Sequence, residues 1–461
     1  MKKHQQSMLQ GPLFSSIIAY TIPIILTSLL QLLFNAADLV VVGRFCGSQS
    51  VAAVGATGSI SNLVVNLFVG LSVGAGVTMA HAIGRRDNDA MHRTVHTALP
   101  IAAISGVVLT IIGVCYAETF LTWMDTPKDV LPLSVVYMQI YFSGMTFSMI
   151  YNFSATILRA AGDTKSPLIF LSIAGVINVV LNVIFVTLFH MNVAGVALAT
   201  TISQGISAVL VVIALMRRTD ASRLYLKKLR IYKPQLLQIV AKGLPAGIQD
   251  SLFSISNVVI QSSINSFGDV FLSGSSAASN IEGFVYVCTN SFMQTSMNFI
   301  GQNAGAGQYK RIKKIAGICM ACVAVVGITL GAIVYIFSPQ ILAIYITDSP
   351  QSIVYGVERL AYVLLPCFLL GLLNVASGAL RGLGASMSPM IVSVLGVCGF
   401  RILWVETVFQ MPQFHAPNWL FMSYPISWVL TFAAELILLV FVYRKFAAKC
   451  QIMEEIASGV E

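Results

Sequence analysis

The chain has 461 residues and a formal net charge of +9, and 57% of its residues are hydrophobic whereas 10% are charged. Soluble domains carry about 25% charged residues. This chain therefore has too few charged residues to cover a water-exposed surface of its size, which excludes a soluble enzyme. Apolar segments of about 20 residues, each long enough to cross a hydrocarbon layer ~30 Å thick, recur from end to end. We expect an all-α integral membrane protein.

Apolar runs interrupted by Gly, Pro and charged residues predict twelve transmembrane helices. In chain order they are expected near residues 15–42, 51–80, 94–117, 131–158, 167–189, 193–216, 236–264, 274–300, 315–337, 353–380, 389–409 and 418–443.

The basic residues predict the direction of these spans. With the N-terminus in the cytoplasm, most of the 27 Lys and Arg residues fall in cytoplasmic segments, whereas Arg44 and Lys128 fall outside. Cytoplasmic loops of membrane proteins carry such an excess of positive charge. We therefore expect a multi-pass protein of the plasma (inner) membrane with both termini in the cytoplasm. The basic charge is an orientation signal, so nucleic acid is not expected as a partner.

The second half of the sequence repeats the first at a constant offset. LRAAGDTKSP at 158–167 returns as LRGLGASMSP at 380–389, and Pro23 returns as Pro245 at the same offset. Because each repeat holds six spans, both copies enter the membrane in the same direction. The duplication predicts two six-helix bundles related by a pseudo-two-fold axis along the membrane normal, and a substrate route between two such bundles is a transporter design.

The hydrophilic stretch 217–234 lies at the midpoint and reads as a cytoplasmic linker between the two halves. We assign residues 1–222 to an N-lobe with helices 1 to 6, and residues 223–461 to a C-lobe with helices 7 to 12.

Asp38 is a charged side chain in the first predicted span, where it costs at least ~2.5–3.5 kcal/mol. It lies with Gln31 and Asn35 at spacings i, i+4 and i+7, so the three share one helix face. A buried carboxylate needs partners that stabilise its charge, or a proton that removes it. We interpret Asp38 as a cation or proton site, with a structural role as the alternative.

Further polar residues lie in the fifth and sixth spans. Asn178 and Asn182 form an i, i+4 pair, and Thr200 follows in the next helix. Counted along the helices, these residues and Asp38 lie about 8 to 16 Å from the outer ends, so they can share one layer. Interhelical packing is the alternative for the amides and the hydroxyl. The positions at the repeat offset in the second half cannot bind a hard cation: Ile260, Phe400, Trp404 and Met422.

The second half carries acids of its own. Asp250 and Glu282 are deep enough to meet a cationic substrate, or they could pair with Arg401 or a backbone group. Together with Gln31 and Asn35 they form the candidate substrate set. Glu406 and Glu435 are nearer the predicted helix ends, where polar surroundings are within reach. The cysteines and histidines show no metal-ligand spacing, so neither a metal nor a cofactor is expected.

At the level of motifs, the chain resembles the multidrug and toxic compound extrusion (MATE) family, on its DinF-type branch. The resemblance rests on NAADLVVVGRF at 35–45, VGAT at 54–57, VAGVALAT at 193–200, IQSSINSFG at 260–268 and the repeated LRAAGDTKSP segment. It implies a secondary antiporter that exports cationic or amphipathic compounds in exchange for protons or sodium, which would serve multidrug efflux and antibiotic resistance. A monomer in the lipid bilayer is expected.

The resemblance also implies which residues couple transport to an ion. An acid on helix one, an Asn and an acid one turn apart on helix five, and a Thr on helix six correspond to Asp38, Asn178, Asn182 and Thr200. Asn182 departs from the pattern, because relatives often have Asp there. With one carboxylate fewer, a sodium ion at the Asp38 cluster would be held more weakly, so we favour H+ as the coupling ion over Na+.

Two alternatives remain. A lipid-linked precursor flippase of the wider superfamily would need a basic cavity for pyrophosphate, whereas the intramembrane charges here are mainly acidic. An intramembrane enzyme would need paired catalytic groups at one depth, and the histidines are isolated. Dye efflux from proteoliposomes under a pH gradient separates these alternatives from an antiporter.

Overall fold

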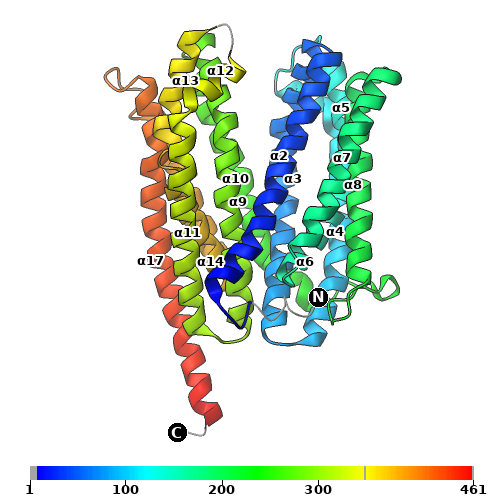
Figure 1. Cartoon of the computed structure of the whole chain (residues 1–461), viewed down its shortest axis with the longest axis vertical. Helices are drawn as coiled ribbons and strands as arrows, with labels where there is room; N and C mark the ends of the chain where they lie inside the picture. The colour runs from blue at the N-terminus through cyan, green and yellow to red at the C-terminus, as the bar shows by residue number, and fades with distance from the viewer. Residues whose placement is uncertain (1–7, 347–348, 459–461) are drawn as a thin grey trace. The chain divides into compact units, whose positions relative to one another are not determined.

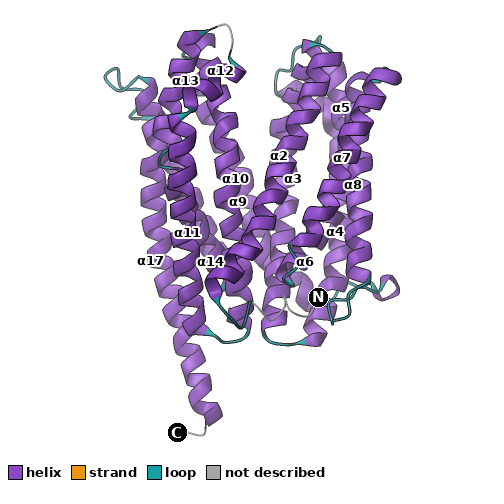
Figure 2. Ribbon diagram, in the orientation of Figure 1, coloured by secondary structure: helices purple, strands orange, loops and turns teal. Residues whose placement is uncertain are grey.

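The computed structural model describes residues 8–346 and 349–458, without the side chains of residues 59, 60, 457 and 458. Within these ranges the chain forms helices joined by loops and contains no β-strand (Figure 2). By length and composition, eight of the described helices are able to cross a membrane, or ten if each of two bent helix pairs is one span. The all-α membrane architecture is therefore confirmed.

The predicted fourth span, 131–158, consists of two helices that meet at Gly144 with a bend of 46°. The α-helices of the first half are labelled in Figure 1 and are α2 (Leu13–Phe45), α3 (Ser48–Gly84), α4 (Asn88–Trp123), α5 (Leu131–Ser143), α6 (Met145–Ala160), α7 (Lys165–Val183) and α8 (Asn192–Met216). The π-helix η1 (Ile184–Leu188) follows α7, and the 3-10 helix η2 (Leu226–Lys228) follows α8.

The predicted tenth span, 353–380, is likewise bent, by 42°, where Pro366 precedes α14 and cannot donate a backbone hydrogen bond. The elements of the second half are α9 (Lys233–Asn265), α10 (Asp269–Gly305), α11 (Tyr309–Ile336), α12 (Ser338–Tyr345), α13 (Pro350–Val363), α14 (Cys367–Gly382), α15 (Met387–Ser393), the π-helix η3 (Val394–Gly399), α16 (Phe400–Glu406) and α17 (Pro417–Ser458).

The chain separates into two compact units. Of the described residues, unit 1 holds 22–251, and unit 2 holds 8–21 together with 252–346 and 349–458. The division therefore falls inside α2 and inside α9, which each contribute to both units. In unit 1 the core gathers around α4, α6 and α8, and in unit 2 α10 packs against α11, α13 and α14. The lobe boundary near residue 222, which rests on the repeat, stays a prediction.

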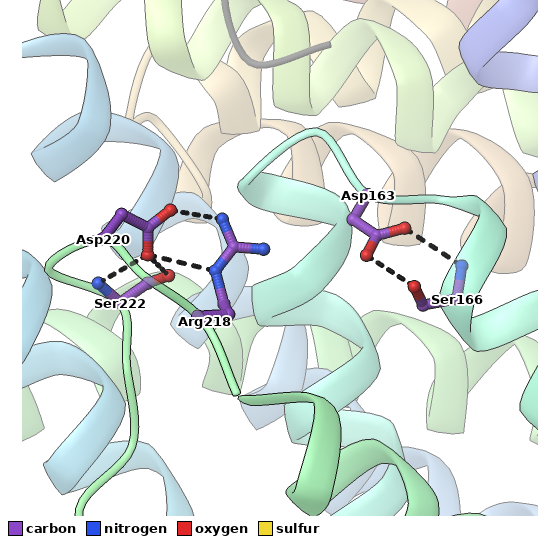
Figure 3. Close-up of polar contacts among 5 residues, drawn as sticks. All are labelled: Asp163, Ser166, Arg218, Asp220 and Ser222. Carbon is purple, nitrogen blue, oxygen red and sulfur yellow. Dashed lines mark hydrogen bonds and ion pairs between the residues drawn. The ribbon is translucent and has the colours of Figure 1, made fainter. Parts of the chain in front are cut away.

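The repeated LRAAGDTKSP segment is a helix stop in both copies. Gly162 (φ 88°) and Gly384 (φ 91°) adopt the left-handed conformation that glycine tolerates best. In each copy the glycine N–H donates to the carbonyl three residues back at 2.9 Å, and the next N–H donates five residues back, at 2.9 and 3.0 Å. This is a Schellman motif. In the first copy Asp163 also accepts hydrogen bonds from the N–H and hydroxyl of Ser166, at 3.0 and 2.6 Å (Figure 3).

The stretch 217–232, most of the predicted linker, is folded against the N-terminal part of α4. His96 Nε2 accepts a hydrogen bond from the N–H of Tyr225 at 3.1 Å, and Thr97 Oγ1 accepts one from the N–H of Tyr232 at 3.1 Å. Near the start of the linker, Asp220 accepts from Arg218 Nε at 3.1 Å and from the N–H of Ser222 at 3.0 Å (Figure 3). The linker is thus held by specific contacts within unit 1.

In unit 1, α3 and α9 cross at a pair of small-residue motifs. Gly70 and Gly74 are one turn apart on α3, and Gly243 and Gly247 are one turn apart on α9. A Cβ atom on Gly70 would lie 2.2 Å from the backbone nitrogen of Gly247, and one on Gly74 would lie 2.1 Å from the carbonyl oxygen of Ile239. Such glycines let two backbones approach closely within a membrane.

We expect Gly74→Leu to lower the thermal stability of the detergent-purified protein. The added side chain would meet backbone rather than a movable side chain, and overpacking of this kind costs at least ~1–3 kcal/mol. Gly55→Leu is the matched control on the same helix, because a Cβ atom there meets nothing within 4 Å. Equal melting temperatures for the two variants would contradict the close crossing.

The π-helix η3 changes the register between the two sequence repeats. Pro167 and Pro389 are both buried and correspond at the repeat offset, as the motifs predict. From within η3 onward the buried positions are displaced by one further position, because a π-helix accommodates an extra residue in a helical run. The buried positions in the first repeat are Ala174, Gly175, Asn178, Asn182 and Val186, and those in the second are Val397, Cys398, Arg401, Val405 and Phe409.

Candidate functional site

Unit 1 brings four predicted polar residues together in a ring of hydrogen bonds. Asp38 comes from α2, Asn178 and Asn182 come from successive turns of α7, and Thr200 comes from α8. Asn182 Nδ2 donates to Asp38 Oδ1 and lies 3.2 Å from Asn178 Oδ1. Asn178 Nδ2 lies 3.3 Å from Thr200 Oγ1, which in turn lies 3.3 Å from Asp38 Oδ2. The helical spacing read from the sequence therefore places these side chains in contact.

Three of the four ring residues are buried, and Thr200 is partly exposed. The exposed fraction is 9% for Asp38, 5% for Asn178 and 0% for Asn182. Val42, one turn from Asp38 on α2, and Val196, one turn from Thr200 on α8, belong to a buried apolar cluster. In such surroundings the charged form of a carboxyl group is penalised by the loss of water, so a proton or a cation bound here gains strongly from the negative charge.

Two oxygens of the ring, Asn182 Oδ1 and Thr200 Oγ1, are able to change their hydrogen-bond partners. Asn182 Oδ1 is buried and has no hydrogen-bond partner among the described residues. The Thr200 hydroxyl carries one hydrogen but has two acceptors within reach, Asp38 Oδ2 and the Val196 carbonyl at 3.0 Å. If the Asn182 amide turns over, its oxygen can accept a hydrogen bond from a protonated Asp38. The ring is therefore able to accommodate both the charged and the neutral carboxyl group.

Two tyrosines on α5 extend the site and were not predicted from the sequence. Tyr137 and Tyr141 are one turn apart with stacked rings, whose centroids are 6.1 Å apart at an interplanar angle of 8°. Both interact electrostatically with Asp38. Their i, i+4 spacing was visible in the sequence. The region around them is so apolar, however, that the pair resembles ordinary packing.

The predicted substrate residues lie outside the ring. Gln31 and Asn35 are exposed on α2, and Asp250 is exposed on α9. Within the described residues, no group of three or more His, Cys, Asp or Glu side chains is arranged to hold a metal ion. The ring itself offers one carboxylate, two amides and one hydroxyl.

Glu282 lies in unit 2, where it forms a bidentate ion pair. Its two carboxylate oxygens accept from Arg359 Nε and Nη2, each at 2.9 Å. Arg359 is 5% exposed and also donates to Ser275 Oγ at 2.8 Å. Of the alternatives left open for Glu282, the pairing with Arg401 is therefore wrong. Arg401 instead donates to Ser427 Oγ at 3.0 Å and lies over the ring of Tyr424 at 4.0 Å.

The two remaining acids of the second half differ from each other. Glu406 is exposed, as its place near a helix end predicts, but Glu435 is 0% exposed, so the predicted polar surroundings for Glu435 are wrong. Glu435 lies near the middle of the 42-residue helix α17, which extends well beyond the predicted end of the twelfth span.

Comparison with known proteins identifies the class of this fold. A solved structure described as the outward-facing conformation of a multidrug resistance MATE family transporter of the MOP superfamily superposes with a TM-score of 0.85. The match covers 96% of this chain and 98% of that chain at 20% identity, so it establishes the fold. The chain has the fold of a membrane transporter.

The sequence comparisons give the family. The MatE family model matches residues 23–184 and, a second time, residues 245–405. The chain belongs to the MatE family, which confirms the resemblance read from the motifs at the level of the family and identifies the chain as a transporter. The probable multidrug resistance protein YoeA of Bacillus subtilis (strain 168) is 28% identical over 396 residues, which cover 84% of this chain and 85% of that relative. The FAD transporter of Shewanella oneidensis is 22% identical over 404 residues, covering 85% and 87%.

Proposed function

We propose that this transporter is a secondary active antiporter of the DinF-type branch, which exports cationic and amphipathic compounds in exchange for protons by alternating access. The observation that carries the proposal is the buried hydrogen-bonded ring around Asp38, because a carboxyl group held by amides and a hydroxyl is suited to gain and lose a proton. Relatives that are named as probable multidrug resistance proteins support the substrate class.

The proposed membrane arrangement has twelve spans in two six-helix bundles. Ten spans follow from apolar length, counting each bent pair once. We add α9 and α10, which have 33 and 37 residues and are long enough to cross, although they are more polar. The distribution of Lys and Arg supports a plasma-membrane protein with both termini in the cytoplasm. We further propose that it works as a monomer without a cofactor.

In the proposed cycle, Asp38 is charged until the site opens to the outside and takes up a proton. The Asn182 amide then turns over to accept from the protonated carboxyl group, and Thr200 Oγ1 keeps the Val196 carbonyl as its acceptor. Loss of the negative charge weakens the attraction of unit 1 for a cationic substrate. Gln31, Asn35 and Asp250 are the proposed substrate contacts in this unit. In unit 2, Glu282 is a proposed substrate contact of its own, available only when a substrate cation displaces Arg359.

The energy available depends on the charge of the substrate. Exchange of a univalent cation for one proton moves no net charge, so only the pH difference drives it, at ~1.4 kcal/mol per pH unit, about a tenfold accumulation. A neutral substrate would also use the membrane voltage, ~2.3 kcal/mol per 100 mV.

We expect a cationic dye to leave proteoliposomes when a pH gradient is imposed, and we expect added Na+ at fixed pH to leave the rate unchanged. A single carboxylate among neutral ligands binds Na+ weakly, whereas Asn182→Asp places a second carboxylate beside Asp38. This variant should therefore respond to Na+ when the parent protein does not. Efflux that requires Na+ in the parent would overturn the proton assignment, and no efflux under either gradient would overturn the antiporter.

A further inference from the structure

A second buried carboxyl group lies in unit 2, on α17. Glu435 is 0% exposed. Its Oε1 accepts a hydrogen bond from Ser393 Oγ at 2.6 Å, whereas its Oε2 is buried and meets no hydrogen-bond donor in the described part of the chain. Both oxygens of a buried, charged carboxylate need hydrogen-bond donors. In this geometry only Oε1 of Glu435 has one.

Among the described residues, the elements packed against α17 contribute one charged group that interacts electrostatically with Glu435. These elements are α11, α13, α14, α15, α16 and η3. From α14, Arg381 acts on Glu435 electrostatically. Other charged or titratable groups on these elements have contacts of their own among the described residues. Arg359 of α13 pairs with Glu282, Arg401 of α16 lies over Tyr424, Cys398 of η3 lies beside Arg401, and the Tyr309 carbonyl of α11 accepts from Tyr443 two turns beyond Glu435.

A buried polar stripe runs along α14 toward its C-terminal end. Asn374, Ser377 and Arg381 lie at spacings i, i+3 and i+7, so they share one helix face, and all three are buried. Asn374 Nδ2 and Ser377 Oγ have no hydrogen-bond partner within residues 8–346 and 349–458. Apolar side chains would pack better at these positions if they only filled the core. The stripe ends at Arg381, the penultimate residue of α14, and the loop that contains Gly384 follows directly after the helix.

We propose that Glu435 is a second proton-binding group of this transporter, located in unit 2 and reached from the α14 loop along the polar stripe. The proton binds Oε2 of the carboxylate and makes a neutral carboxylic acid, and no other bond forms or breaks. Ser393 is a positioning residue that holds Oε1. This site shares no residue with the Asp38 ring. The proposal for Glu435 can therefore be tested independently of the proposed antiport mechanism.

Infrared difference spectroscopy of the protein reconstituted in lipid tests the proposal directly. A protonated carboxyl group has a C=O stretching band that a carboxylate lacks. At neutral pH, wild-type protein should show one such band that is absent from Glu435→Gln and retained in Asp38→Asn. Glu406→Gln is the matched control, because it makes the same change at an exposed glutamate of unit 2 and should remove carboxylate bands only.

The proposal is overturned if Glu435→Gln removes only carboxylate bands, because Glu435 would then be charged and neutralised by Arg381. If Glu435→Gln does not fold, Ser393→Ala decides the question, since it keeps the acid and removes the hydroxyl that donates to Oε1. Ser393→Ala should shift the frequency of the carboxylic band without abolishing it. A carboxylic band that does not move in Ser393→Ala contradicts the assignment to Glu435.

Discussion

Asp38→Asn is expected to abolish pH-driven dye efflux and leave the protein folded. An amide has nearly the shape of a protonated carboxyl group and can still bond to Asn182 and Thr200, so the ring should persist. It cannot release a proton, so a gradient of one pH unit, worth ~1.4 kcal/mol and about tenfold accumulation in the parent, should produce none in the variant. The measurement is dye distribution across proteoliposomes at known pH on both sides.

The matched control for this variant is Asp129→Asn, which removes an exposed acid from the loop before α5 in the same unit. It should transport like the parent. Melting temperatures of both variants establish that any loss of efflux comes from chemistry rather than unfolding. Undiminished pH-driven efflux in Asp38→Asn would remove the ring from the mechanism.

Glu282→Ala should destabilise the protein strongly, because it leaves the buried Arg359 guanidinium without its counter-charge. Removing one partner of a buried ion pair costs ~3–5 kcal/mol. The bidentate geometry, with two contacts of 2.9 Å, and the additional bond from Arg359 to Ser275 place this pair at the upper end of that range. Thermal unfolding in detergent measures the effect, with Glu406→Ala as the exposed control.

The double variant Glu282→Leu with Arg359→Met separates structure from transport. Replacing both charges by apolar side chains removes the unpaired charge, so most of the stability lost in Glu282→Ala should return. If stability returns and efflux is normal, the ion pair is structural. Unchanged stability in Glu282→Ala together with lost efflux would instead make Glu282 a substrate ligand.

The Asp38 ring was predictable because its members follow local rules. Residues one turn apart on a helix share a face, and a polar residue in an apolar span must face another polar group or water. These two rules are enough to bring Asn178 and Asn182 toward a neighbouring helix. These rules did not predict that Tyr137 lies near Asp38, because a tyrosine is polar only at its hydroxyl group and is otherwise typical of apolar packing.

The errors arose where partners are distant in sequence. Glu282 pairs with Arg359, and no local pattern distinguishes that arginine from Arg401 before the helices pack. The burial of Glu435 was missed because distance from a predicted helix end says nothing about the neighbours of a side chain, and α17 is longer than its apolar part. The bends at Gly144 and Pro366 were hidden because both halves of each predicted span are apolar.

The extra residue in η3 reassigns one counterpart in the duplicated fold. The constant offset of the sequence motifs pairs Asn178 with Phe400, whereas the buried positions beyond the π-helix pair it with Arg401. A permanently charged guanidinium, stacked on Tyr424, thus stands where the first copy has a neutral amide beside Asp38. At equivalent positions of the duplicated fold, the first copy therefore carries a neutral amide near an acid, while the second carries a fixed cation.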